Sequence, residues 1–160
     1  MIHTSRIKEL NQKPKQQEAN FVIYWLQASQ RVHYNLALQY AVSQANKQEK
    51  PLLVYFELME DFPEANLRHF HFMLQGLQEL EKDLEKINCK LVINFKKEAA
   101  PQLIELAKKA TEVITDREYT KYLNAKKAKY AKDLPCKLTQ IEDNVVIPIE
   151  TVSNKAEYAA

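Results

Sequence analysis

The amino-acid sequence predicts an α/β fold of the Rossmann-like, doubly wound type: a five-stranded parallel sheet with helices on both faces. Short runs of apolar, β-branched and aromatic residues, which are typical of strands covered on both faces, alternate strictly with longer helical segments. The 160 residues, of which 46% are hydrophobic, are enough for one domain with its own core. Strict alternation of strands and helices gives an open, parallel sheet.

The elements expected in the first half of the chain follow a polar segment. Residues 1–18 are rich in Lys and Gln and are interrupted by Pro14, so we expect a flexible N-terminal arm. The apolar run FVIYWL then indicates a buried strand, and a second such run, LLVYF, lies further along. Between them, Leu36, Tyr40 and Ala41 recur at helical spacing. The expected elements are a strand at 21–26, a helix at about 34–46 and a strand at 52–56.

The second half begins with the clearest helix in the sequence. Its apolar residues fall on one stripe, opposite Glu and Lys residues: Leu67, Phe70, Met73, Leu74, Leu77, Leu80, Leu84 and Ile87. Further helices are expected at 101–110, where Pro101 suits the first turn, and at 119–134. Strands are expected at 91–95, 112–115 and 136–140, with a last extended piece at 145–147.

The composition excludes several classes of ligand site. Gly76 is the only glycine, whereas a dinucleotide-binding turn, a Walker A loop and a nucleophile elbow each need several. A net charge of +2 gives no general attraction to nucleic acid or to an anionic membrane, and no apolar run approaches the ~20 residues of a membrane-spanning helix. The two cysteines, Cys89 and Cys136, are far apart, which favours buried thiols in a reducing cytoplasm over a zinc site or a disulfide.

A ligand of a doubly wound sheet binds beyond the carboxyl ends of the strands, where the strand order reverses. The segments expected at that edge are 27–35, 57–61, 95–98 and 116–119. The first of them, QASQRVHYN, carries several hydrogen-bond donors, and it is equally well interpreted as a capped loop. The pattern therefore places a site without specifying its chemistry.

Other side chains that could carry chemistry have plainer interpretations. His69 and His71 lie two positions apart in a predicted helix and point about 200° apart, so they are unsuited to chelating one metal ion. The lysines of 121–132, interleaved with Tyr122 and Tyr130, could follow a phosphate backbone, but such a set more often forms an exposed helix face.

Three stretches of the sequence carry a resemblance to a known family. They are VIYWLQASQRVHYNLAL (22–38), PLLVYFELMEDFPEANLRHFHFMLQGLQELE (51–81) and EDNVVIPIETVSNKAEYAA (142–160). In this order they resemble the N-terminal part of the class II cyclobutane pyrimidine dimer DNA photolyases. The resemblance runs from about Phe21 to Ala160 and is weaker between Lys96 and Lys137.

The resemblance implies a function. Photolyases have an N-terminal α/β domain and a larger helical domain, which holds FAD, binds DNA and injects an electron from the reduced flavin under blue light. The N-terminal domain can hold an antenna chromophore, an 8-hydroxy-5-deazaflavin or a reduced folate, that passes excitation energy to the flavin. By this resemblance, residues 19–150 are the antenna domain and residues 151–160 start the linker to an FAD domain that this chain lacks.

The expected protein is therefore a cytoplasmic domain that supports the FAD domain of the same protein and repairs nothing alone. It is expected to bind neither DNA nor a membrane directly. Two other classes remain open: a stand-alone α/β module for a small molecule or nucleotide, and a structural interaction domain without a ligand.

Eight residues at the expected edge are candidates for a chromophore pocket. Cationic and amide groups would hydrogen-bond the chromophore's carbonyls, and an aromatic ring would pack near it. The candidates are Trp25, Gln27, Arg31, Asn35, Glu57, Lys96, Glu98 and Asp116. Each has an alternative interpretation: Trp25 as a core residue, Arg31 as the partner of a carboxylate, and Asn35 as the cap of the first helix.

The sequence departs from the family pattern around this edge. The family has two acidic residues where this chain has His33 and Tyr34, after Val32. It has a tryptophan where this chain has Leu36. Where many members have Gly-Asp-Pro, this chain has Lys97-Glu98-Ala99, which puts a long cationic side chain where a flat ring would enter. The sequence therefore leaves both binding of an antenna chromophore and its absence open.

Overall fold

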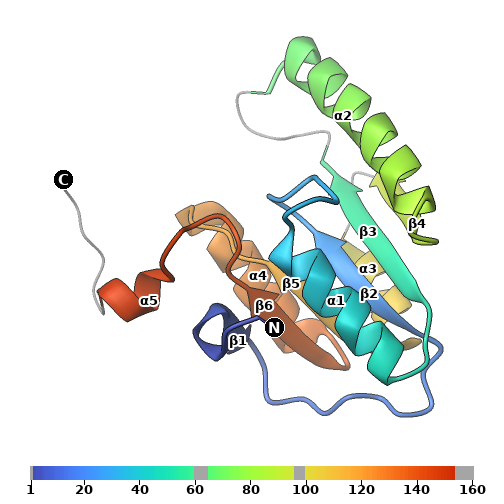
Figure 1. The fold of residues 1–160 in the computed structure, drawn as a ribbon, viewed down its shortest axis with the longest axis vertical. Helices are drawn as coiled ribbons and strands as arrows, with labels where there is room; N and C mark the ends of the chain where they lie inside the picture. Colours follow the sequence, from blue (N-terminus) through green and yellow to red (C-terminus); the bar gives the residue numbers. More distant parts are fainter. Residues whose placement is uncertain (1, 60–64, 96–99, 154–160) are drawn as a thin grey trace.

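Six strands form one sheet in the computed structural model, which describes residues 2–59, 65–95 and 100–153 (Figure 1). In sheet order they are β1 (Ile7–Glu9), β6 (Lys137–Ile141), β5 (Ala110–Asp116), β2 (Phe21–Leu26), β3 (Leu52–Leu58) and β4 (Lys90–Phe95). Strands β2 to β6 run parallel to one another, and β1 is antiparallel to β6. The predicted doubly wound α/β fold with five parallel strands is confirmed, and a short edge strand is added to it.

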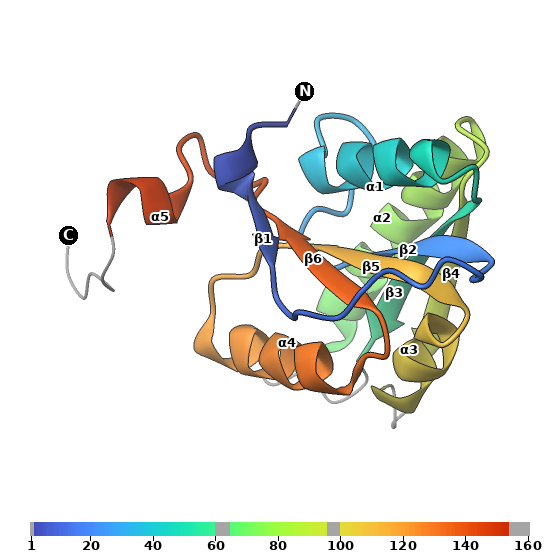
Figure 2. The ribbon, with the colours of Figure 1, turned by 90° about the horizontal axis from the view of Figure 1, so that it is seen from below.

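Helices cover both faces of the sheet (Figure 2). They are α1 (Leu36–Lys47) and α2 (Leu67–Glu85) on one face, and α3 (Ala100–Ala107) and α4 (Lys121–Asp133) on the other. Each face has its own core cluster, and β2 contributes to both. Tyr24 and Leu26 pack toward α1 and α2, whereas Ile23 and Trp25 pack toward α3 and α4. Side chains that alternate along a buried strand therefore fill both layers.

Helix α2 is only half packed against the sheet. Leu77, Leu80 and Leu84, in its second half, are buried in the core. In its first half, Leu67 is 85% exposed and Phe72 is 81% exposed. Figure 1 shows the start of this helix beyond the end of β3. The first half of α2 therefore forms a wall above the carboxyl edge of the sheet.

The N-terminal segment differs from the flexible arm expected at residues 1–18. Residues 7–9 pair with β6, Ile7 facing Ile141 in the register. Further along, Asn11 Nδ2 donates to the carbonyls of Ala131 and Cys136, and Gln16 Nε2 donates to the carbonyls of Ala107 and Ala110. The polar side chains of this segment thus bind backbone carbonyls elsewhere in the domain. Apolar runs, which predict the other elements, therefore give no sign that this segment is ordered.

The segment after β6 is not the extended piece expected at 145–147. It is irregular and leads into the short helix α5 (Ile149–Val152). The Arg6 guanidinium donates to the carbonyls of Glu142, Val145 and Val146, which ties this segment to the N-terminal segment. Of the linker expected at 151–160, the residues after Ser153 lie outside the described ranges.

The thiols of Cys89 and Cys136 are free and buried, as expected. Burial raises the pKa of the Cys136 thiol to about 11. Across the described ranges, no helix combines the length and the apolar character that crossing a membrane requires.

Candidate functional site

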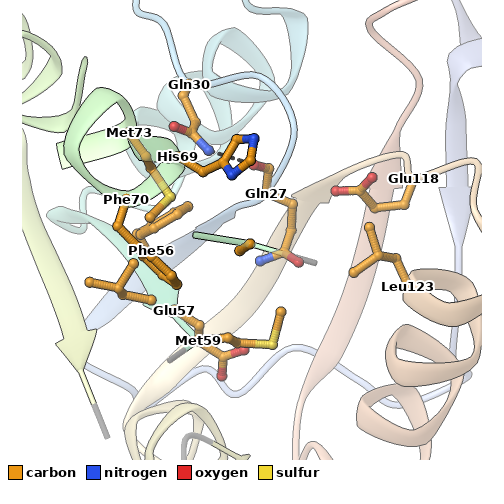
Figure 3. Close-up of a pocket in the computed structure, with 12 residues that line it drawn as sticks. Gln27, Gln30, Phe56, Glu57, Met59, His69, Phe70, Met73, Glu118 and Leu123 are labelled. Carbon is orange, nitrogen blue, oxygen red and sulfur yellow. Dashed lines mark hydrogen bonds between the residues drawn. The ribbon is translucent and has the colours of Figure 1, made fainter. Parts of the chain in front are cut away.

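A pocket of about 230 Å³ lies at the carboxyl edge of the sheet (Figure 3). The chain passes from β2 out to β3 and β4 and then returns to the other side of β2 for β5, so the strand order reverses between β2 and β5. The loop after β2, the end of β3, the start of α2 and the segment between β5 and α4 enclose the pocket. Its position is the one at which doubly wound sheets bind ligands.

The pocket combines apolar walls with a few polar groups. Figure 3 shows Phe56, Phe70 and Met73 together on one side, Glu118 on the opposite side and Gln27 between them. Further lining residues are the apolar Met59 and Leu123 and the polar Gln30, Glu57 and His69. Apolar walls with few polar groups are typical of sites for small organic ligands, in which the polar groups fix the ligand's orientation.

Glu57, at the end of β3, is held by two residues of α4. Tyr130 Oη donates a 2.7 Å hydrogen bond to Glu57 Oε1, and Lys126 Nζ lies 2.9 Å from Oε2. The Glu57 side chain is nearly fully buried. Burial, together with the negative charge of Glu57, raises the pKa of Tyr130. The pocket thus has a fixed carboxylate whose charge is balanced by Lys126.

His69 is placed by the capping of α2. Its Nδ1 accepts a 3.1 Å hydrogen bond from the backbone N–H of Asn66, and the Asn66 side chain caps the helix in return. Because Nδ1 is the acceptor, a neutral His69 carries its hydrogen on Nε2. This nitrogen is therefore left as a donor at the wall of the pocket.

Asp116, the last residue of β5, holds the loop after β2. Its carboxylate accepts hydrogen bonds from the backbone N–H groups of Gln27, Ala28 and Ser29, at 2.9, 2.6 and 2.6 Å. Burial raises the pKa of this carboxyl group, and the N–H donors and Lys127 act in the opposite direction. Asp116 therefore supports the polar side of the pocket from below and is not one of its lining residues.

Lys127 completes this support from α4. Its Nζ donates to the backbone carbonyl of Asp116, and the residue is 3% exposed. Burial lowers the pKa of Lys127 to about 8, against the attraction of Asp116 and Glu118. A buried amine thus lies directly behind the end of β5.

Arg31 and Asn35 lie in the same loop and are directed away from the pocket. Arg31 Nη2 is 2.9 Å from Asp143 Oδ2, in the segment after β6. Asn35 Oδ1 accepts from the backbone N–H of Leu38 and so caps α1, while Asn35 Nδ2 donates to the carbonyls of Ser29 and Arg31. Arg31 therefore pairs with a carboxylate and Asn35 caps a helix, which are the alternative interpretations that the sequence offers for them.

Trp25 is a core residue. It is 1% exposed, and its ring lies 4.6 Å from the ring of Tyr130, between centroids, with an interplanar angle of 58°. Its indole Nε1 has no hydrogen-bond partner among the described residues. The ring therefore lies in the core on the α4 side of the sheet and does not line the pocket.

The structure brings only part of the predicted set into the pocket. Gln27 and Glu57 line it, Asp116 supports the loop, and Arg31, Asn35 and Trp25 contact other parts of the domain. Lys96 and Glu98 lie outside the described residues. The set of eight stays a prediction, since no ligand contact tests it.

Sequence reasoning missed most of the apolar lining. Phe70 and Met73 belong to the apolar stripe of α2, whose spacing predicts a helix and assigns none of its residues to a ligand site. The signal that could have found them is the length of that stripe, because a helix of 19 residues extends beyond a sheet whose strands have seven residues or fewer. In the described parts of the chain, no group of three His, Cys, Asp or Glu residues is placed to hold a metal ion.

Residues 22–160 match the sequence profile of DNA photolyase. The chain belongs to the DNA photolyase family. A deoxyribodipyrimidine photo-lyase of Methanothermobacter thermautotrophicus is 40% identical over 161 residues, which cover the whole of this chain and 36% of the relative. A deoxyribodipyrimidine photo-lyase of Potorous tridactylus is 30% identical over 151 residues, covering 91% of this chain and 28% of that relative. The chain thus spans about a third of the length of the curated photo-lyases it matches.

Two solved structures share the fold of this chain. A bacterial class III photolyase from Agrobacterium tumefaciens matches with a TM-score of 0.63 and 22% identity, over 78% of this chain and 26% of that chain. A universal stress protein, UspA from Lactobacillus plantarum, matches with a TM-score of 0.51 and 12% identity, over 77% of this chain and 98% of that chain. At these identities the likeness is one of fold.

Proposed function

We propose that the chain is the antenna domain of a class II cyclobutane pyrimidine dimer photolyase. It binds a light-harvesting chromophore, an 8-hydroxy-5-deazaflavin or a reduced folate, in the carboxyl-edge pocket. The same edge packs against an FAD-binding domain, where the light-driven repair takes place. The class II assignment rests on the three stretches of sequence resemblance, 22–38, 51–81 and 142–160.

The observation that carries the chromophore proposal is the pocket itself. The amides of Gln27 and Gln30 supply donors for ring carbonyls, and the carboxyl groups of Glu57 and Glu118 accept from ring N–H groups. Phe70 and its apolar neighbours supply a surface for a flat ring. A volume of about 230 Å³ is below the roughly 300–1,000 Å³ of typical ligand sites, so it suits a ring system whose polar chain extends outside.

No acid, base or nucleophile is required for the antenna role. Energy transfer depends on the distance and orientation of two chromophores, which rigid side chains control. The Glu57 carboxylate is fixed from both sides by Tyr130 and Lys126, and the loop that carries Gln27 is fixed by Asp116. These contacts suit a site that holds a pigment in a fixed orientation.

Exposed apolar side chains at the same edge support the packing against a second domain. They follow the carboxyl ends of strands or lie in the first half of α2: Tyr34, Leu67, Phe72, Leu74, Phe95, Tyr119, Tyr122, Val146, Ile147, Ile149 and Val152. The other large hydrophobic residues with comparable exposure, among those described, are Ile87 and Ile93. Such a concentration is typical of an interaction surface.

The chromophore proposal is tested by titrating the chain with 8-hydroxy-5-deazaflavin and, separately, with a reduced folate. We expect saturable binding of one of them, with a shifted absorption spectrum. Met73→Trp fills the pocket and should weaken binding at least about tenfold. Leu74→Trp, on the same helix and outside the pocket lining, is the matched control and should bind as the unmodified chain does.

Two results would overturn the proposed binding site. One is a folded chain that binds neither chromophore, and the other is a Met73→Trp variant with unchanged affinity. The docking surface is tested separately, with the C-terminal part of the Methanothermobacter photo-lyase as the partner. Phe72→Lys should weaken this association and Ile87→Lys should leave it intact, whereas equal effects of both would contradict docking at the carboxyl edge.

A further inference from the structure

Trp25, Tyr130 and Glu57 form a connected group between the core and the pocket. The two rings are in contact, with centroids 4.6 Å apart, and Tyr130 Oη donates a 2.7 Å hydrogen bond to Glu57 Oε1. All three side chains are buried, and Glu57 also lines the pocket. Trp25 is the only tryptophan in the sequence. An unbroken path therefore leads from this tryptophan, through a tyrosine, to a carboxylate at the pocket wall.

The two aromatic residues differ in what can accept their proton. The Trp25 indole Nε1 has no hydrogen-bond partner among the described residues, so an oxidised indole has nowhere to release its proton. Tyr130 has a carboxylate oxygen at 2.7 Å. Burial and the Glu57 charge raise the pKa of Tyr130, so the hydroxyl keeps its proton at neutral pH. Oxidation of Tyr130 must therefore move an electron and a proton together.

Glu57 is well placed to accept that proton. The transfer runs along an existing hydrogen bond, so no side chain has to move. Lys126 holds the second carboxylate oxygen at 2.9 Å and its Nζ lies 5.8 Å from the centre of the Tyr130 ring. The acceptor oxygen therefore stays aligned with the phenol throughout the transfer.

We propose that Tyr130 reduces an oxidised Trp25 and passes its phenolic proton to Glu57. The oxidant is an electronically excited ring pigment in the pocket, and in this respect the proposal rests on the proposed function. Trp25 loses one electron to the pigment, and Tyr130 then gives one electron to Trp25 and its hydroxyl proton to Glu57 Oε1. The products are a neutral Trp25, a neutral Tyr130 radical, a protonated Glu57 and a pigment that has gained one electron.

The transfer can be tested without any pigment. A laser pulse at a wavelength that tryptophan absorbs and tyrosine does not will photo-oxidise Trp25 selectively, with an added electron acceptor that removes the ejected electron. Transient absorption then follows the decay of the tryptophan radical and the rise of the tyrosyl radical. We expect Tyr130→Phe to abolish the tyrosyl signal and Glu57→Gln to slow its rise at least about tenfold.

Tyr55→Phe is the matched control. Tyr55 pairs with Trp25 in the register of β2 and β3, its side chain also hydrogen-bonds with Glu57, and its hydroxyl accepts a 3.1 Å hydrogen bond from Asn94, so it is the tyrosine that could compete with Tyr130. Its removal should leave the tyrosyl signal in place. A signal that persists in Tyr130→Phe, disappears in Tyr55→Phe or is as fast in Glu57→Gln would overturn the proposal.

The radical measurement and the chromophore titration fail independently. Radical transfer without chromophore binding would support the redox role of Tyr130 and overturn the proposal that the pocket binds a pigment. Chromophore binding without radical transfer would retain the antenna function and remove the redox role of Tyr130. When both hold, Trp25→Phe should also lengthen the fluorescence lifetime of the bound pigment, because the electron donor that quenches it is lost, whereas Tyr130→Phe should leave this lifetime unchanged.

Discussion

The carboxylate of Asp116, at the end of β5, accepts a 2.6 Å hydrogen bond from the backbone N–H of Ser29, in the loop after β2. The two residues are far apart in the sequence, yet this contact and its two neighbours fix the loop across the point where the strand order reverses. Hydrogen bonds from backbone N–H groups therefore fix the position of the loop that carries Gln27 to the polar side of the pocket. A side chain of β5 determines where the loop of β2 lies.

Replacing Asp116 by Ala should destabilise the domain and loosen this loop. Three backbone N–H groups would lose their acceptor, that of Ser29 at a buried position and those of Gln27 and Ala28 at partly buried ones, and one unsatisfied buried group costs about 1–3 kcal/mol. We expect a loss of at least about 2 kcal/mol in the free energy of unfolding, measured by urea titration. Asp133→Ala, at the exposed end of α4, is the control, and an equal loss there would contradict this assignment.

The two asparagine caps should differ in their contribution. Asn35 is fully buried, and its side chain joins the N-terminus of α1 to the loop before it. Asn66 caps the exposed start of α2. We expect Asn35→Ala to cost about 2 kcal/mol of stability or more and Asn66→Ala about 1 kcal/mol or less, both measured by urea unfolding. The reverse order would show that the interior contacts of Asn35 contribute little.

The salt bridge between Lys15 and Glu112 should hold the N-terminal segment under the sheet. Glu112 is fully buried and its Oε1 lies 2.5 Å from Lys15 Nζ, so Lys15→Met leaves a buried carboxylate with less compensation. We expect a loss of about 1–3 kcal/mol and easier proteolysis within residues 10–20. Lys8→Met breaks the bridge to Glu150, in which both partners are half exposed, and should cost below about 1 kcal/mol.

Lys127 should make the domain more stable in mild alkali. Its folded-state pKa, about 8, is below the ordinary value of 10.5, so in this interval the unfolded chain binds a proton that the folded chain has released. The contribution of Lys127 to the free energy of unfolding therefore becomes more favourable to the folded state as the pH rises through this interval. Urea titrations across it should show the unmodified chain gaining stability relative to Lys127→Met. A constant difference would indicate that Lys127 has an ordinary pKa in the folded domain.

The parallel strands could be predicted from the sequence because strands buried on both faces consist almost entirely of apolar, β-branched and aromatic residues. FVIYWL is β2 over the predicted residues, and LLVYF is β3 apart from two further residues at its end. The strand β1 could not be found in this way. Its sequence, IKE, has one apolar residue, and its pairing depends on backbone hydrogen bonds and on β6, which lies more than 120 residues away.

The position of the site could be predicted, but the direction of its side chains could not. A carboxylate that follows a buried strand gives the same pattern whether it faces a ligand, as Glu57 does at the pocket wall, or a neighbouring loop, as Asp116 does. Arg31 and Asn35 lie in the expected loop, but the partner of Arg31 is the carboxylate of the distant Asp143, and Asn35 contacts local backbone groups. The role of all these residues toward a ligand remains a prediction.

The antiparallel strand β1 also protects the molecule from its own copies. Without it, β6 would be an outer strand whose backbone N–H and C=O groups are open to a strand from another molecule. β1 closes that side with three residues, two of them charged, which offer little template for further pairing. A chain shortened by its first residues would therefore tend to aggregate through β6, so any truncation designed to isolate the pocket should keep Ile7 to Glu9.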